Sequence, residues 1–318
     1  DFKRTKGENG AVVYSHMAHH SGMSLGALTN YFYDGFLRRA FLSSNYISAN
    51  AVLLDEKMPL GVLPRKKTHI SEEPKIIKQE DFIREYIYPE KQSAEMLVLS
   101  GGELRIEATS KGKIKIFNGE TYIGQAYLYV QGEKTSSISF YPVKDKSKSY
   151  KTQFKPECAT YISKDKHLEF ENSVYAVEDT CEALFSVKIS NNSEEPLTQK
   201  IIFVLDPVLN TFDNYKAHPY FNGLSIEAES ENNILKLKNL KTDKTCVLSS
   251  IDEQNIVFET DKQNILGRGN GYDKPRLLFN ETPKHYPITP IMALSVEVSI
   301  NPGEKKETDI LLSFGEPI

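Results

Sequence analysis

The sequence has no tryptophan, only three cysteines, and no run of about 18 apolar residues, the length that crosses a bilayer as a helix. Three cysteines cannot all pair within one chain, and Cys158, Cys181 and Cys246 do not have the spacing of metal ligands. We therefore expect buried free thiols and no membrane-spanning helix. Without tryptophan, aromatic stacking on a ligand must come from tyrosine, phenylalanine or histidine.

The sequence also has no large excess of positive or negative charge. The 318 residues include 39 Lys and Arg against 43 Asp and Glu, a net charge of −4, which argues against a basic nucleic-acid-binding protein. With 39% hydrophobic and 26% charged residues, the composition also differs from that of a disordered chain. The opening DFKRTKGENG lacks the apolar region of a signal peptide and begins with Asp, so we expect a piece of a longer polypeptide.

Residues 1–60 have helical periodicity. Apolar residues recur at helical spacing over Ser21–Phe41, and a second helical stretch over Tyr46–Met58 stops at a proline. Together they predict an α-helical hairpin joined by a short turn. Residues 61–94 are charged and interrupted by prolines, which indicates an extended linker.

From residue 95 to residue 318 the apolar pattern changes to a period of two. Tyr127 and Tyr129 share one face if their segment is a strand, which puts Tyr122 on the other. Many short strands separated by turn clusters, with no helical pattern between them, predict a mainly β fold, a large antiparallel β super-sandwich. The predicted strands are 103–107, 113–117, 122–130, 137–143, 167–170, 181–189, 200–205, 234–237, 256–259, 293–300 and 308–313.

The densest cluster of chemically active side chains lies at residues 15–25. His16 and His20 are four residues apart, so a helix would place both on one face, where they could bind zinc. The HExxH pattern, however, requires Glu where this chain has Met17, and no third ligand is identifiable. We therefore expect no metal. His19 and His20 are instead candidates for hydrogen bonds within the fold or to a sugar.

Longer stretches carry a family resemblance. YSHMAHHSGMSLGALTNYF and NAVLLDEKMP resemble the end of the glucoamylase-like helical domain of cyclic β-1,2-glucan synthetases, although Ser21 replaces the Gln of that family's MAHHQGMSL. VKISNNSEEPLTQKIIFVLDPVL, AHPYFNGLSIE, FETDKQNILGRGN and PITPIMALSVEVSINPGEKKETDILLSFG resemble the sandwich that follows, shared with the cellobiose-phosphorylase-like enzymes of glycoside hydrolase family 94. Residues 112–130 match that family poorly.

The resemblance implies a galactose-mutarotase-like super-sandwich over residues 95–318, preceded by the helical tail of an upstream domain over residues 1–60. It also implies a parent enzyme whose catalytic acid lies in a downstream (α/α)6 barrel, so we expect no catalytic residue and no cofactor in this chain. The implied partners are a β-glucan or oligosaccharide, that downstream domain and a second copy of the chain. A parent with a membrane-embedded transferase domain would place this part on the cytoplasmic side.

The AHPYF stretch supplies one pair of candidate sugar-contacting residues. His218 and Tyr220 lie in an irregular loop that follows the predicted strand 200–205 and begins with Asp206. Imidazole, phenol and carboxylate groups on a loop are suited to bind sugar hydroxyls and to stack on a pyranose face. The alternative is that this loop packs onto its own core.

The LGRGN stretch supplies the second pair, Arg268 and Asp273. Glycines on both sides of Arg268 allow a tight bend, and the planar guanidinium suits hydroxyl or carboxylate groups. The alternative is an internal ion pair between Arg268 and an acid such as Asp261 or Asp273.

Three functions are compatible with these residues. The favoured hypothesis is a non-catalytic, carbohydrate-binding or structural sandwich of a multidomain glucan-active glycosyltransferase or phosphorylase. A second is an aldose-epimerase-like enzyme, in which a His and a Glu exchange protons with the ring oxygen and the anomeric hydroxyl; His167 with Glu169, or His218 with a strand Glu, are candidate pairs. A third is a purely structural oligomerisation module.

Overall fold

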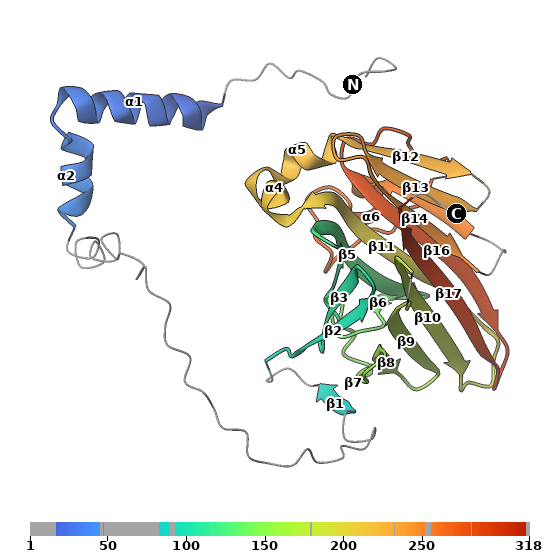
Figure 1. Cartoon of the computed structure of the whole chain (residues 1–318). Helices are drawn as coiled ribbons and strands as arrows, with labels where there is room; N and C mark the ends of the chain where they lie inside the picture. The colour runs from blue at the N-terminus through green and yellow to red at the C-terminus, as the bar shows by residue number, and fades with distance from the viewer. Residues whose placement is uncertain are drawn as a thin grey trace, which may run out of the picture. The chain divides into compact units, whose positions relative to one another are not determined.

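A computed structural model of the chain describes residues 17–44, 47, 83–88, 93–178, 180–231, 233–251, 256–280 and 282–315. The chain divides into two compact units, one comprising residues 11–76 with residues 1 and 2, the other residues 77–318 with residues 3–10. The described helices of the first unit are α1 (Ala18–Phe32) and α2 (Phe36–Leu42), and every described strand belongs to the second unit (Figure 1).

The helical hairpin is present, but both of its arms come from the stretch predicted as one helix. The turn between α1 and α2 passes through Asp34 and Gly35, which have φ values of 50° and 72°. Because a positive φ is incompatible with a continuous right-handed helix, the apolar periodicity alone misplaced this break. The second predicted helix, Tyr46–Met58, lies outside the described residues except for position 47.

The second unit consists of two antiparallel sheets that face each other, which confirms the super-sandwich prediction (Figure 1). In order across the nine-stranded sheet A, the strands are β1 (Arg84–Tyr88), β7 (Ser149–Phe154), β8 (Ala159–Lys164), β9 (Leu168–Ala176), β10 (Glu182–Asn191), β17 (Lys305–Phe314), β14 (Lys244–Ser250), β13 (Ile234–Asn239) and β12 (Ile226–Glu231). In order across the eight-stranded sheet B, they are β15 (Ile256–Asp261), β16 (Pro290–Ile300), β11 (Leu197–Thr211), β5 (Thr121–Gln131), β4 (Ile114–Asn118), β3 (Leu104–Thr109) and β2 (Met96–Gly101), with β6 (Thr135–Ser137) paired to β5.

The predicted strands differ from the observed ones in three ways. The predicted strand 137–143 is wrong beyond its first residue, since β6 ends at Ser137 and an irregular segment follows. Strand β1 pairs with β7, so sheet A includes part of the stretch 61–94 that we interpreted as a linker. Strands β2, β7, β8, β12 and β14 were not predicted, and neither were the helices α4 (Phe212–Ala217), α5 (Pro219–Gly223) and α6 (Lys262–Leu266).

The main core lies between the two sheets. Alternate side chains of both sheets are buried there, and the rings of Phe185 on β10 and Phe203 on β11 meet edge to face at 4.9 Å between centroids. Removing apolar area from water stabilises the fold by roughly 25 cal/mol per Å², so a core of this extent accounts for folding without disulfides. Cys158 and Cys246 are free and buried, and Cys181 is free and half-buried.

Sheet B is apolar on its outer face as well. Tyr127, Tyr129, Ile202 and Val204 form a second cluster on that face, under a segment that runs from α6 to residue 280. Within this segment the ring of Tyr272 stacks on that of Tyr127, with centroids 4.0 Å apart and planes 8° apart. Tyr127 and Tyr129 are therefore packing residues covered by the chain and do not form an open platform.

A β-bulge on β5 places Tyr122 on the same outer face, where we had expected it on the opposite one. The side chains of β5 that face the core switch from odd to even positions between Ile123 and Ala126, because β5 has one extra residue here in its pairing with β4, where Ile116 pairs with Gly124 and Phe117 with Tyr122. Gly124, with φ 156°, lies at this point, and a Cβ there would be 2.2 Å from the carbonyl oxygen of Asp206. The bulge therefore depends on glycine, and it brings Tyr122 towards Asp206.

We expect Gly124→Ala to lower the free energy of unfolding by about 3 kcal/mol, since the backbone of β11 must move to accept the methyl group. Gly303→Ala is the matched control: its φ is 73°, but a Cβ there has no neighbour within 4 Å. The control should cost only about 1 kcal/mol, from backbone strain. Urea denaturation measures both, and equal losses would contradict the role given to the bulge.

Candidate functional site

A pocket of about 220 Å³ opens beside the C-terminal part of β11, next to α4, α5 and the start of α6. We call it the Asp206 pocket. Its walls come from both loops that carry the predicted site residues, since residues 206–223 supply one side and Lys262 the other. The residues that line it are Asp206, Pro207, Tyr215, Pro219, Tyr220, Asn222, Gly223, Lys262, Ile288, Thr289 and Pro290.

An ion pair joins the two sides of the Asp206 pocket. Lys262 Nζ lies 2.8 Å from Asp206 Oδ1, and both side chains are half-buried. The ammonium also lies 5.3 Å from the centre of the Tyr272 ring, within reach of a cation–π interaction. The pocket thus offers a fixed acceptor beside a fixed donor.

Four tyrosines lie close enough to this carboxylate for its charge to affect their pKa. Burial raises the pKa of four tyrosines on this face, and the negative charge of Asp206 raises each of them further. They therefore remain protonated at neutral pH and act as hydroxyl groups. These tyrosines are Tyr122, Tyr127, Tyr215 and Tyr272.

Tyr220 is the predicted residue that the structure places in this pocket. It lies on α5 with 63% of its surface exposed. Helix α5 is anchored beneath it by Asn222, whose amide donates to the Val208 carbonyl at 2.7 Å. His218 lies between α4 and α5 with its ring 5.9 Å from that of Phe221, and it does not line the pocket.

The other predicted residues are not brought to the pocket. Arg268 and Asp273 are exposed in the segment after α6, and neither pairs with the other among the described residues. Asp261 does not pair with Arg268 either, since its partners are Lys284 and the first turn of α6. His19 and His20 are exposed on α1 in the first unit. The His16–His20 pair cannot be described, because His16 lies outside the described residues.

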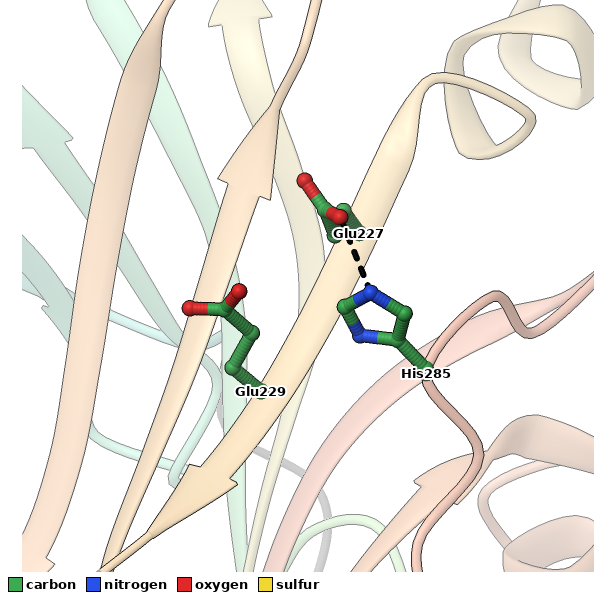
Figure 2. Close-up of side chains that lie close together, drawn as sticks. All are labelled: Glu227, Glu229 and His285. Carbon is green, nitrogen blue, oxygen red and sulfur yellow. Dashed lines mark ion pairs between the residues drawn. The ribbon is translucent and has the colours of Figure 1, made fainter. Parts of the chain in front are cut away.

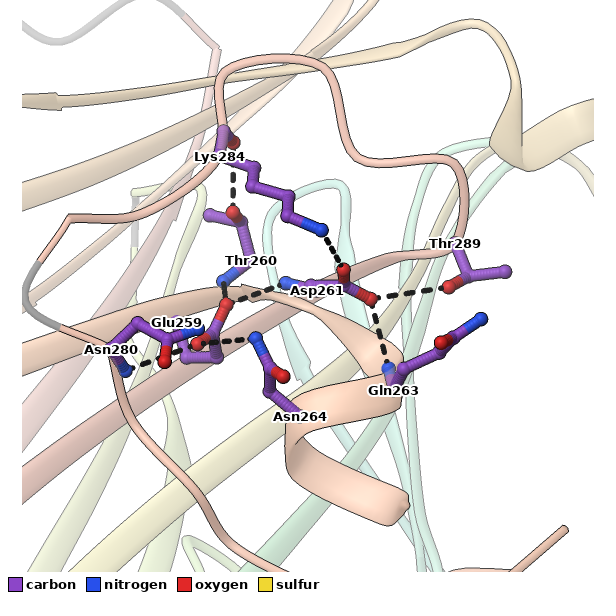
Figure 3. Close-up of polar contacts among 8 residues, drawn as sticks. All are labelled: Glu259, Thr260, Asp261, Gln263, Asn264, Asn280, Lys284 and Thr289. Atoms are coloured by element: carbon purple, nitrogen blue, oxygen red, sulfur yellow. Dashed lines mark hydrogen bonds and ion pairs between the residues drawn. The ribbon is translucent and has the colours of Figure 1, made fainter. Parts of the chain in front are cut away.

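A buried glutamate holds the segment that supplies Lys262. Glu259 is 1% exposed, and its carboxylate accepts four hydrogen bonds from uncharged donors (Figure 3). Asp261, two residues on, caps α6 by accepting from Gln263 N at 3.0 Å and pairs with Lys284 (Figure 3). The four donors are Thr260 N, Asp261 N, Asn264 Nδ2 and Asn280 N, at 2.8, 2.8, 3.0 and 3.2 Å.

A second cluster of titratable groups lies at the edge of sheet A (Figure 2). His285 Nε2 is 3.0 Å from Glu227 Oε1, and Glu229 follows on the same face of β12. One ligand atom from each lies within 4.8 Å of the others, which is compatible with a cation, although two of the three residues are exposed. The expected pairs do not form: Glu169 pairs with Lys164, and His218 has no carboxylate partner among the described residues.

Sequence reasoning missed Lys262 and Tyr272. Lys262 lies within the quoted FETDKQNILGRGN stretch and Tyr272 lies two residues after it, but nothing in the local pattern shows that this part of the chain folds back over β5 and β11. The signal that could have revealed it is the near-continuous apolar run of both strands, which indicates burial on two faces.

A sequence profile of the glycosyl hydrolase 94 supersandwich domain matches residues 124–317, more than half of the chain. The chain belongs to this family. A curated relative is the cyclic β-(1,2)-glucan synthase NdvB of Rhizobium meliloti (strain 1021), 23% identical over 348 residues. The alignment covers 96% of this chain but only 12% of NdvB, so this chain spans a small part of the length of that protein.

Solved structures with a similar fold include a bacterial glucoamylase in complex with acarbose, with 14% identity and a TM-score of 0.43, covering 74% of this chain and 36% of that one. A galactose mutarotase-like protein from Lactobacillus casei ATCC 334 has 11% identity and a TM-score of 0.36, covering 70% of this chain and 100% of that one.

Among the residues that the structure describes, no helix has the length and apolar character needed to cross a bilayer.

We expect Glu259→Gln to destabilise the supersandwich by about 2–3 kcal/mol. A glutamine keeps one acceptor oxygen but turns an amide donor towards two of the four donors. Glu297→Gln on β16 is the control, because that side chain is half exposed and its ion pair with Lys200 is long, at 3.9 Å. The control should change stability by less than about 0.5 kcal/mol in the same urea titration. Similar effects of the two changes would show that Glu259 does not organise this segment.

Proposed function

We propose that this supersandwich domain is a non-catalytic, carbohydrate-binding part of a glucan-active glycosyltransferase or phosphorylase, and that the Asp206 pocket holds one glucosyl unit of a β-1,2-linked chain. The observation that carries the proposal is an exposed tyrosine ring beside a half-buried carboxylate–lysine pair. Tyr220 can stack on the apolar face of a pyranose, while Asp206 and Lys262 accept from and donate to its hydroxyls.

The volume of the Asp206 pocket and the family of the chain support a glucosyl unit as the ligand. A volume of about 220 Å³ is smaller than the roughly 300–1,000 Å³ of pockets for drug-sized molecules, which favours a single sugar ring. The match to the glycosyl hydrolase 94 supersandwich and the name of the NdvB relative favour a glucan as the sugar and a β-1,2 linkage. On the same basis we propose that chemistry is performed by another domain of the parent protein.

Tyr220→Ala should weaken the binding of a β-1,2-linked pentaglucoside about tenfold, the equivalent of 1.4 kcal/mol. Stability should change by less than about 0.5 kcal/mol, because the ring is 63% exposed. The methyl groups of Ile288 line the pocket, so their NMR shifts during a titration report the dissociation constant.

Tyr286→Ala is the matched control, since this tyrosine is also exposed, at 50%, and lies outside the pocket lining. Its removal should leave the titration unchanged. If the Ile288 methyl signals do not move at millimolar pentaglucoside, the Asp206 pocket does not bind glucan. If no methyl signal of the chain moves, a purely structural role in assembling the parent or a dimer is favoured instead.

The alternative activity, aldose 1-epimerisation, has one observation in its favour. His285 lies between Glu227 and a cavity of about 640 Å³ whose lining also includes Glu229 and Thr260. An epimerase, however, needs an acid and a base at two separate oxygens of the sugar, whereas His285 and Glu227 are in contact with each other.

We therefore expect polarimetry of α-D-glucose to give the mutarotation rate of buffer alone when the chain is added. A faster rate that His285→Ala abolishes, and that His167→Ala leaves intact, would replace the binding function with an enzymatic one.

A further inference from the structure

A cavity of about 970 Å³ lies away from the Asp206 pocket and shares no residue with it. We call it the Lys148 groove. It is formed by residues 130–136 and 197–199 of sheet B and its β5–β6 turn, by the segment 145–148 before β7, by the segment 165–168 between β8 and β9 of sheet A, and by the 192–195 turn between the sheets. Both sheets therefore contribute to this end of the sandwich.

A buried lysine with few partners lines this groove. The side chain of Lys148 is 8% exposed, and its ammonium donates to Ser136 Oγ at 2.9 Å. Asp165 Oδ2 lies 4.0 Å from Nζ, beyond hydrogen-bond distance, and the Phe170 ring centre lies at 4.6 Å. Burial lowers the pKa of Lys148, as expected for an ammonium group that has lost water without a close counter-ion. An ammonium group has three N–H donors, and the hydrogen bond to Ser136 uses one of them, so the others are available to a ligand.

The groups around the ammonium are held in fixed positions. Asp165 Oδ1 accepts from the backbone of His167 and Leu168, both at 2.8 Å, which leaves Oδ2 turned towards Lys148. The backbone N–H of Asn192 donates to the His167 carbonyl at 2.7 Å, so the two turns are tied together. The donor and the acceptor are thus preorganised 4.0 Å apart, so that one oxygen atom beside them can lie within hydrogen-bond distance of both.

The charges of the groove decide which ligand suits it. Five carboxylates and three lysines line it, together with serine, asparagine and glutamine side chains. An anion would be repelled by the carboxylates, and a metal ion by the buried ammonium beside them. A neutral hydroxyl group fits both, because it accepts from Lys148 and donates to Asp165. A ligand with several hydroxyl groups can form further hydrogen bonds of this kind with the neighbouring polar side chains.

We infer that the Lys148 groove is a second saccharide-binding site, in which a sugar hydroxyl bridges Lys148 and Asp165. The nature of the site follows from its own chemistry, while the choice of a β-1,2-linked glucan as the ligand rests on the function proposed above. A site of this size accommodates several sugar units, in contrast to the Asp206 pocket.

The test is a methyl NMR titration of the full 318-residue chain with a β-1,2-linked pentaglucoside. The methyl groups of Val130, Leu168 and Leu197 report on the Lys148 groove, and those of Ile288 report on the Asp206 pocket. We expect both sets to shift, with Lys148→Met weakening the binding seen in the first set about tenfold and leaving the second set unchanged.

Lys148→Met should fold at least as stably as the parent chain, since an apolar side chain of similar length replaces a buried charge. Asp165→Asn keeps Oδ1 as the acceptor for its turn and removes the second acceptor, so it should weaken binding in the same way. Lys188→Met, at an exposed position on β10 outside both sites, is the control and should change neither set.

Shifts of Ile288 alone would overturn the second site and leave the proposed function standing. Shifts of the first set alone would uphold the second site and refute the assignment of the Asp206 pocket. Shifts of the first set that survive both Lys148→Met and Asp165→Asn would overturn the hydroxyl bridge, and no shift in either set would overturn both proposals.

Discussion

The architecture depends on the fact that the centre of sheet B is apolar on both faces. Strands β5 and β11 bury almost every side chain along their central stretch. One face packs against sheet A, and the other has to be covered by something else. The segment from α6 to residue 280 covers β5 and β11, and α4 lies over their ends at Tyr122 and Val208. The Asp206 pocket lies where these two covers meet, so it follows from the need to bury the second face.

The carboxylates inside this cover are tolerated because each has defined partners. Glu259 is nearly inaccessible to solvent, yet four N–H donors surround it. Asp206 is paired with Lys262, and protonated tyrosine hydroxyls lie around it. A buried polar group with partners on all sides specifies one arrangement of the chain, because any other leaves it unsatisfied. The same groups that fix the cover thus give the pocket its rigid acceptor and donor.

The two proposed sites use different chemistry for the same class of ligand. The Asp206 pocket offers an exposed aromatic ring, whereas the Lys148 groove offers mainly fixed polar groups between turns. Both lie on loops and turns supported by the sheets, where residues can be varied without disturbing the core. Neither proposed site requires a catalytic acid, in keeping with the non-catalytic binding role proposed above.

The sequence by itself determined the fold class and most of the strands, because alternation of apolar and polar residues is a local property. It failed at β7 and β8, where Thr152, Thr160 and Ser163 are buried and interrupt the apolar pattern, and at residues 138–143, where an alternating pattern forms no strand. It placed Tyr220 among the candidate site residues on the chemistry of its loop. Tertiary structure alone decided that Lys262 lies against Asp206, that His218, Arg268 and Asp273 stay out of that pocket, and that Tyr122 changes face. The first two outcomes depend on contacts between segments far apart in the sequence, and the third depends on the bulge at Gly124. No local sequence pattern encodes either cause.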